Sequence, residues 1–131
     1  PGMVRKKQQV WDDALRTGVV YTVLGRRRRL YGDPKDRMKE AWSHMVSGTV
    51  TDMVNDTLIK VTAMFPACYL VLNSHDGLIL SFPDDHPTTR TYAEVRPLAE
   101  RSWDIGGVTM ATSCTWEFVT SNGTVSYPKA S

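Results

Sequence analysis

The sequence predicts an α+β fold in which an antiparallel sheet is backed by helices. Over residues 35–64, apolar side chains recur at intervals of three and four residues, which is typical of a helix. Two apolar segments, residues 69–73 and 78–82, flank an Asp-Gly turn and predict a hairpin. Residues 19–24 are rich in β-branched side chains and end at Gly25, which predicts a second hairpin.

The N-terminal segment predicts a short amphipathic helix that leads into this second hairpin. Its apolar positions near helical spacing are Met3, Val10, Trp11, Ala14 and Leu15. Gly18 follows them and marks the end of the helix. Residues 26–30 would return as the second arm of the hairpin, so that four consecutive arginines crowd its turn. We therefore expect an arginine-rich hairpin after the first helix.

The long helix over residues 35–64 has a defined start, a weak middle and a defined end. Asp33 can cap the free N–H groups of the first turn, and Pro34 sits where no N–H is needed. Residues 47–51 contain glycine and β-branched residues, each costing up to about 1 kcal/mol relative to alanine in a helix. The helix therefore either bends there or is closely approached by another segment. Phe65-Pro66 ends it.

The C-terminal third gives weaker signals. A third helix is expected over residues 88–103, although Pro97 must kink or split it. Residues 108–118 are expected to form one last strand. Residues 122–131 are expected to be a loose tail.

Composition indicates a soluble, intracellular protein of one domain. The 131 residues are 41% hydrophobic and 23% charged, which argues against disordered and fibrous classes. The longest apolar runs fall far short of the roughly 20 residues that span a bilayer, and no N-terminal signal pattern precedes them. Cys68 and Cys114 lack the spacing of a zinc or thioredoxin motif, so we expect two reduced core residues.

Charge is distributed unevenly along the chain. Residues 1–39 hold 11 of the 16 Lys and Arg residues but only four of the 14 acidic residues, so this part is +7 and the remainder is −5. A concentrated cationic segment favours a polyanionic partner, because neutralising each phosphate releases counterions. Taken alone, the charge is equally compatible with a solvated basic face.

The turn Ser74-His75-Asp76-Gly77 is the most informative tetrapeptide. An Asp-Gly turn by itself usually reflects only backbone chemistry, because glycine tolerates positive φ and aspartate bonds its own backbone. The functional alternative is that the turn presents the Asp76 carboxylate to a hard divalent cation such as magnesium. One carboxylate does not complete such a site, since two-metal phosphoryl transfer needs at least two around ions about 3.5–4 Å apart.

Four stretches follow one another in an order and spacing that carry a resemblance. They are Pro1-Gly2-Met3 with Val-Val-Tyr-Thr-Val-Leu-Gly-Arg-Arg-Arg at 19–28, residues 39–52 with Ser-Gly-Thr-Val-Thr-Asp at their end, Leu-Asn-Ser-His-Asp-Gly at 72–77, and residues 108–116. These stretches resemble four consecutive parts of family A (DNA polymerase I-like) DNA polymerases. The first resembles the stretch after the fingers, and the second resembles the palm helix, which ends in Gln-Gly-Thr-Ala-Ala-Asp in that family. The third resembles motif C (Val-His-Asp-Glu), and the fourth resembles the closing strand. The resemblance covers residues 1–121 and implies the C-terminal palm segment of such an enzyme, followed by the tail at 122–131.

The resemblance implies roles for individual residues. Asp76 would be the catalytic motif C ligand of magnesium, and His75 would lie near the primer terminus. The residues implied in DNA binding are Arg26, Arg27, Arg28, Lys39, Ser43, Ser47, Gly48 and Thr49. Asp52 matches a position that the family uses structurally.

The sequence also departs from the family pattern. Ser43 replaces an asparagine and Ser47 a glutamine, so contacts with DNA would be shorter or bridged by water. Gly77 replaces the motif C glutamate, which implies altered metal affinity or slower catalysis. The motif A aspartate and the triphosphate-binding fingers helix have no counterpart in the chain. A second polypeptide carrying them is therefore expected.

The function implied is that of a subunit or fragment of a DNA-directed DNA polymerase, active only with that second polypeptide. Its ligands would be a primer-template, deoxynucleoside triphosphates and magnesium held in a site shared between the two chains. No membrane partner is expected, and the location implied is the cytoplasm of a bacterial or phage-infected cell, or an organelle. A catalytically silent nucleic-acid-binding module of the same origin and a structural assembly subunit remain the alternatives.

Overall fold

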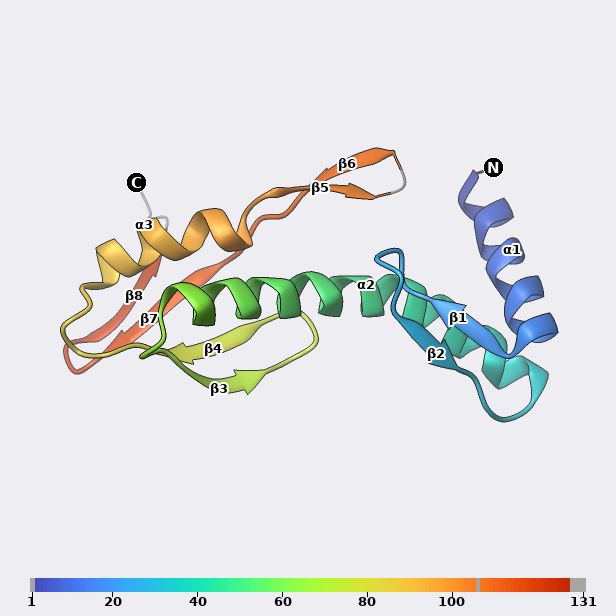
Figure 1. Ribbon diagram of the computed structural model, residues 1–131, viewed down its shortest axis with the longest axis horizontal. Helices are drawn as coiled ribbons and strands as arrows, with labels where there is room; N and C mark the ends of the chain where they lie inside the picture. The colour runs from blue at the N-terminus through green and yellow to red at the C-terminus, as the bar shows by residue number, and fades with distance from the viewer. Residues whose placement is uncertain (1, 106, 128–131) are drawn as a thin grey trace. The chain divides into compact units, whose positions relative to one another are not determined.

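The computed structural model describes residues 2–105 and 107–127 and confirms the α+β class (Figure 1). Its described elements are three helices and eight strands, and every sheet is an antiparallel two-stranded hairpin. In chain order they are α1 (Gly2–Thr17), β1 (Val19–Tyr21), β2 (Arg27–Arg29), α2 (Pro34–Met64), β3 (Tyr69–Asn73), β4 (Leu78–Ser81), α3 (Thr88–Ala99), β5 (Ser102–Ile105), β6 (Val108–Ala111), β7 (Trp116–Thr120) and β8 (Gly123–Tyr127).

The chain forms two compact units rather than the single domain that its length suggested. Unit 1 comprises the residues up to Asn55 together with Ser74–Gly77, and unit 2 comprises Asp56–Asn73 together with the residues from Leu78 onward. Helix α2 contributes its first part to unit 1 and its last part to unit 2. Each unit has its own hydrophobic core.

Unit 1 is built from α1, the β1–β2 hairpin and the first part of α2. Helix α1 ends as predicted at Gly18, which has φ +66° and donates its N–H to the Ala14 carbonyl at 2.9 Å. Strands β1 and β2 pair with Val20 opposite Arg28. The buried residues of this core are Ala14, Val20, Leu30 and Ala41, with Val10 and Met45 packed against them. The predicted N-terminal helix and arginine-rich hairpin are both confirmed.

The weak middle of α2 is explained by close approach of the hairpin. A Cβ atom at Gly48 would lie 2.9 Å from Cγ2 of Thr22, so only glycine leaves room for this contact. The hydroxyl of the neighbouring Thr49 accepts the Val23 N–H at 3.0 Å and donates to the Met45 carbonyl within the helix. At its start, the Asp33 carboxylate caps the helix as predicted, accepting the Lys35 N–H at 2.8 Å.

Unit 2 packs the last part of α2 against α3, the β3–β4 hairpin and β7. Its fully or nearly buried residues are Val61, Phe65, Cys68 and Val95, and the partly buried Leu80, Phe82, Leu98 and Trp116 pack around them. Phe65 meets Phe82 edge to face, with ring centroids 5.4 Å apart. The predicted hairpin over residues 69–82 is confirmed, with a register shift between Leu70 and Leu72.

The predicted third helix ends earlier than expected. Pro97 lies in the last turn of α3, and Trp103 belongs to strand β5 rather than to the helix. Thr112 explains this end, because its hydroxyl donates to the Ala99 carbonyl at 2.7 Å and accepts the Arg101 N–H at 3.1 Å. The side chain thereby satisfies groups that a longer helix would have used, and the chain turns into the β5–β6 hairpin.

Two further predictions for the C-terminal third are wrong. Residues 108–118 form parts of two strands, because β6 pairs with β5 whereas β7 pairs with β8. The expected tail contains strand β8, which turns back at Gly123 with φ +112° and stacks Tyr127 on Tyr92 at 4.5 Å. Residues 128–131 of that expected tail lie outside the described residues.

Two predictions from composition have different outcomes. Cys68 is a free, buried thiol as predicted, but the prediction that Cys114 belongs to the core is wrong, because this residue is exposed. None of the helices in residues 2–105 and 107–127 combines the length and apolar character needed to cross a bilayer.

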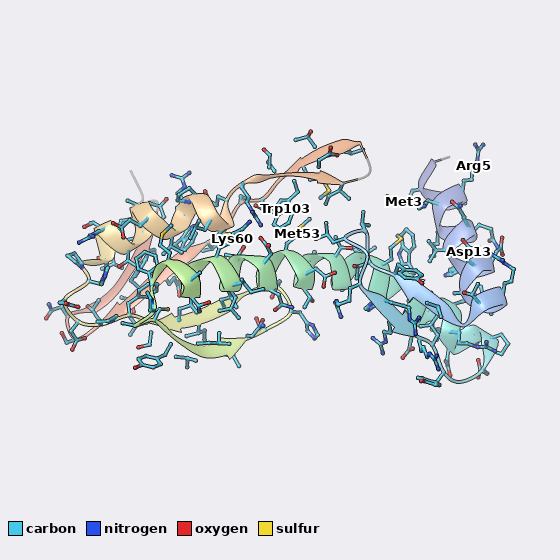
Figure 2. All side chains as sticks on the ribbon, viewed as in Figure 1. Met3, Arg5, Asp13, Met53, Lys60 and Trp103 are labelled. Atoms are coloured by element: carbon cyan, nitrogen blue, oxygen red, sulfur yellow. The ribbon has the colours of Figure 1, made fainter. Side chains whose placement is uncertain are left out.

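In unit 2, Arg101 is in contact with both a charged and an aromatic side chain. The guanidinium pairs with Asp56 and lies 3.9 Å from the ring centroid of Trp103, and Asp56 also pairs with Lys60 at 2.9 Å. Figure 2 shows the labelled Lys60 and Trp103 side chains on neighbouring elements of this unit. This arrangement fastens the start of β5 to α2.

We predict that Glu100 makes unit 2 sensitive to acid. The Trp116 indole donates to its carboxylate at 2.8 Å and Arg96 donates at 2.6 Å, so the pKa of Glu100 lies below its ordinary value of 4.5. A lowered carboxyl pKa stabilises the folded state above the unfolded pKa, and this contribution is lost as the pH falls through the folded pKa. As the pH falls below about 4.5, the free energy of unfolding should therefore decrease less for Glu100→Gln than for the wild type.

Urea unfolding of both proteins between pH 3 and 7 measures this difference. Glu94→Gln is the control, because Glu94 pairs with the exposed Arg90 on the same helix. Identical pH profiles for Glu100→Gln and the wild type would contradict the prediction.

Candidate nucleic-acid interface

Unit 1 contains a groove of about 470 Å³ between the hairpin arm, helix α2 and the turn at residues 74–77. The residues lining it are Arg26, Arg28, Lys39, Glu40, Ser43, His44, Ser47, Gly48, Thr51 and His75. Six residues predicted for DNA binding and one predicted catalytic residue are therefore brought together on one surface.

The hairpin side of the groove is held rigidly by Arg26. Its guanidinium pairs with Asp52 and donates to the Gly48 carbonyl at 3.2 Å, and its backbone N–H donates to the Thr22 hydroxyl at 3.0 Å. Asp52 thereby ties the hairpin to α2 through Arg26. Two turns of α2 and the hairpin are joined at this point, so the position of the following arginines is set by backbone as well as side-chain contacts.

Cationic groups dominate the rim of the groove. Arg28 pairs with Glu40 across the groove wall at 3.4 Å, and both side chains are about half exposed. Within residues 2–105 and 107–127, no carboxylate pairs with the exposed Lys39. Arg27 is exposed on β2 between the two lining arginines and does not itself line the groove. The three lining cations, Arg26, Arg28 and Lys39, face two acidic groups, Glu40 and Asp52, so the surface keeps an excess positive charge that attracts anions.

The floor of the groove is made of short side chains on α2. Ser43 and Ser47 are four residues apart and therefore lie on the same helix face, and both are exposed. Gly48 also lines the groove, and its lack of a side chain both leaves room for the hairpin and adds no bulk to the groove surface. Thr49 is buried and does not line the groove, and its hydroxyl accepts the Val23 N–H and donates to the Met45 carbonyl. Thr49 therefore connects the hairpin to α2.

The turn that carries the candidate metal ligand reaches this groove through His75. The Thr51 hydroxyl lies 3.3 Å from the His75 carbonyl, and His75 is exposed at the groove edge. The Ser74 N–H donates to the Gly77 carbonyl at 2.9 Å and closes the turn. Asp76 is exposed, so the turn is not tucked into the interior, and His75 beside it lines the groove together with Arg26 and Arg28.

Asp76 alone does not fit the donor set of a magnesium site. Among the described residues, no group of three or more His, Cys, Asp or Glu side chains could hold a metal ion. A single exposed carboxylate supplies one of the several oxygen ligands that magnesium requires. Gly77, where the family has glutamate, has no positive φ, so it is not required by the backbone conformation.

Sequence reasoning missed three residues that line the groove: Glu40, His44 and Thr51. They become part of the site only because the hairpin and the turn fold against α2. His44 is 7% exposed, and its pKa is lowered by burial and by the positive charges of Arg26 and Arg28. Its position four residues before Gly48 was the available signal, since these residues share one helix face.

Comparisons with models of known protein families and with curated protein sequences find no match to this chain.

Proposed function

We propose that this chain is the DNA-gripping component of a DNA-directed DNA polymerase that becomes active when a second polypeptide supplies the remaining catalytic groups. The observation that carries the proposal is the groove of unit 1, which Arg26, Arg28 and Lys39 line together with Ser43 and Ser47. Three of the four stretches that resemble family A DNA polymerases, residues 19–28, 39–52 and 72–77, contribute residues to this groove.

The chemistry of the groove suits a nucleic-acid backbone. Phosphates favour cationic side chains because each neutralised charge releases condensed counterions. Short hydroxyl side chains such as Ser43 and Ser47 can bond to sugar or phosphate oxygens without blocking approach of the duplex. A groove in which three cations face two acidic groups keeps a net positive charge and therefore favours a polyanion over a neutral ligand.

The catalytic part of the proposal assigns one metal ligand to this chain. Asp76 is exposed on a tight turn next to His75, which lines the groove. A second polypeptide would contribute the other acidic groups and the helix that binds deoxynucleoside triphosphates. Magnesium, when bound between the two chains, would supply the charge stabilisation for nucleotidyl transfer.

Strand β3 supports association with another chain. All five of its residues are exposed, including Val71 with 63% of its surface free, and neither β3 nor β4 contains a charged residue. Strand edges of this kind are usually covered, because unpaired backbone groups and apolar side chains favour pairing with another strand. Two-stranded sheets are also marginally stable without further packing.

The second candidate function is a catalytically silent nucleic-acid-binding module. It is favoured by Gly77, which lacks the acidic side chain of motif C, and by the single carboxylate at the turn. Both candidates require that the groove binds nucleic acid, and they differ only in whether Asp76 contributes to catalysis.

Binding to a primer-template duplex tests the groove. We expect Arg28→Gln/Lys39→Gln to weaken binding at 50 mM salt and to reduce the slope of log K against log salt by roughly 0.9 per lost phosphate contact. Fluorescence anisotropy over a salt series measures both quantities. The matched control is Arg16→Gln/Arg90→Gln, which removes the same charge from two exposed arginines paired on their own helices.

Equal effects of the two double variants would show that only net charge matters and would contradict a binding site in the groove.

A further inference from the structure

His44 is the one imidazole of unit 1 that is enclosed by the protein. Only 7% of its surface is exposed, yet it lines the groove. Its Nε2 atom is buried and has no hydrogen-bond partner among the described residues. A buried polar atom without a partner costs free energy, so its retention at a binding surface calls for an explanation.

The packing around His44 holds the ring in place. A Cβ atom at Gly48 would lie 3.1 Å from Nδ1 of His44, and Thr22 from the hairpin occupies the same small space. The charged groups that face the ring are Arg26 and Arg28 from the hairpin and Asp52 from its own helix. Arg28 is also paired with Glu40 at 3.4 Å. Burial and two cations therefore oppose protonation of the imidazole, whereas the backbone of Arg26 and the Asp52 carboxylate favour it.

We propose that a nucleic-acid backbone in the groove causes His44 to take up a proton, so that affinity rises as the pH falls from about 7.5 to 6. This inference rests on the proposed nucleic-acid binding. Phosphates beside Arg26 and Arg28 would offset the two charges that hold the imidazole neutral, because the potential at the ring is the sum over all nearby charges. The carboxylate of Asp52, whose Oδ2 has no described partner, would then face an imidazolium.

Linkage fixes the direction of the effect. If the bound state holds its proton more tightly than the free state, lower pH must strengthen binding by the same coupling free energy. Burial and the two arginines lower the pKa of free His44 below its ordinary value of 6.5, so the free protein is largely neutral at His44 at pH 7. Full uptake of one proton corresponds to about a tenfold change in affinity per pH unit.

The test is duplex binding by the full chain between pH 7.5 and 6, using an oligonucleotide without terminal phosphates so that the ligand itself does not titrate. We expect wild-type affinity to rise about three- to tenfold over this range and His44→Gln to lose this rise. His86→Gln, at the histidine of unit 2, is the control and should keep the wild-type slope.

A second measurement avoids dependence on the folding of His44→Gln. Calorimetry of the wild type at pH 6.5 in two buffers of different ionisation enthalpy reports proton uptake on binding directly, and the His44 ring resonance should titrate at higher pH with duplex than without it. Binding that is salt-dependent but takes up no proton would overturn the inference while leaving the proposed function intact. Absence of duplex binding at any pH would overturn the proposed function itself.

Discussion

Asp76→Ala should abolish primer extension by a complex that contains this chain while leaving the chain's affinity for duplex nearly unchanged. Asp76 is exposed on the turn and does not line the groove, so its removal leaves Arg28 and Lys39 in place. A metal-ligating carboxylate, in contrast, acts on the charge that develops during nucleotidyl transfer, and losing it should lower the rate by several orders of magnitude.

The proposed function sets the design of the experiment: the chain is combined with a polypeptide that carries the motif A aspartate and the triphosphate-binding fingers helix. Extension of a labelled primer and anisotropy of the same duplex are measured for Asp76→Ala and for Asp85→Ala, an exposed acidic residue in the loop before α3. Asp85→Ala should behave as the wild type in both assays. Extension that survives in Asp76→Ala would favour the silent binding module.

Elements with strong local signals could be predicted from the sequence. Helix α1, the β1–β2 hairpin, α2 and the β3–β4 hairpin each begin or end at a capping aspartate, a glycine or a proline. These residues determine the backbone conformation of neighbouring residues in the sequence, so their effect does not depend on packing against distant segments. The register shift at Leu70 to Leu72 was not predictable, because it depends on how the strand meets its neighbour.

The C-terminal third depended on contacts that local patterns do not encode. The end of α3 is set by Thr112, which lies 13 residues beyond Ala99. Strand β8 exists because Tyr127 stacks on Tyr92 and packs against Phe118. An Asn-Gly turn signal at Asn122-Gly123 was nevertheless present in the sequence and would have indicated the β7–β8 hairpin.

The candidate site was predictable as a set of residues but not as a geometry. The resemblance to family A polymerases named residues from the hairpin, α2 and the turn, and these share one groove in unit 1. It did not name His44, whose role arises from burial between the hairpin and the helix. It also could not show that Thr49 faces the hairpin, because helix periodicity does not indicate which segment packs against each face of the helix.

Gly48→Ala should destabilise unit 1 even though alanine is the better helix former. The gain in helix propensity is about 1 kcal/mol. Against it, the new methyl group would lie 2.9 Å from Cγ2 of the buried Thr22 and 3.1 Å from the His44 ring, and overpacking of this kind costs about 1–3 kcal/mol. Thr22 cannot move freely, because its hydroxyl accepts the Arg26 N–H at 3.0 Å. The steric cost therefore exceeds the propensity gain.

Urea and thermal unfolding measure this balance, with Ser47→Ala as the control because Ser47 is the exposed neighbour on the same helix and gains propensity without a clash. Gly48→Ala should also weaken duplex binding, since Arg26 reaches the Gly48 carbonyl at 3.2 Å and moves with the hairpin. If Gly48→Ala is instead as stabilising as Ser47→Ala, the hairpin does not approach α2 at this glycine. The arginines would then have no fixed position over the serine floor, and the groove would lose the geometry from which its affinity for a phosphate backbone was inferred.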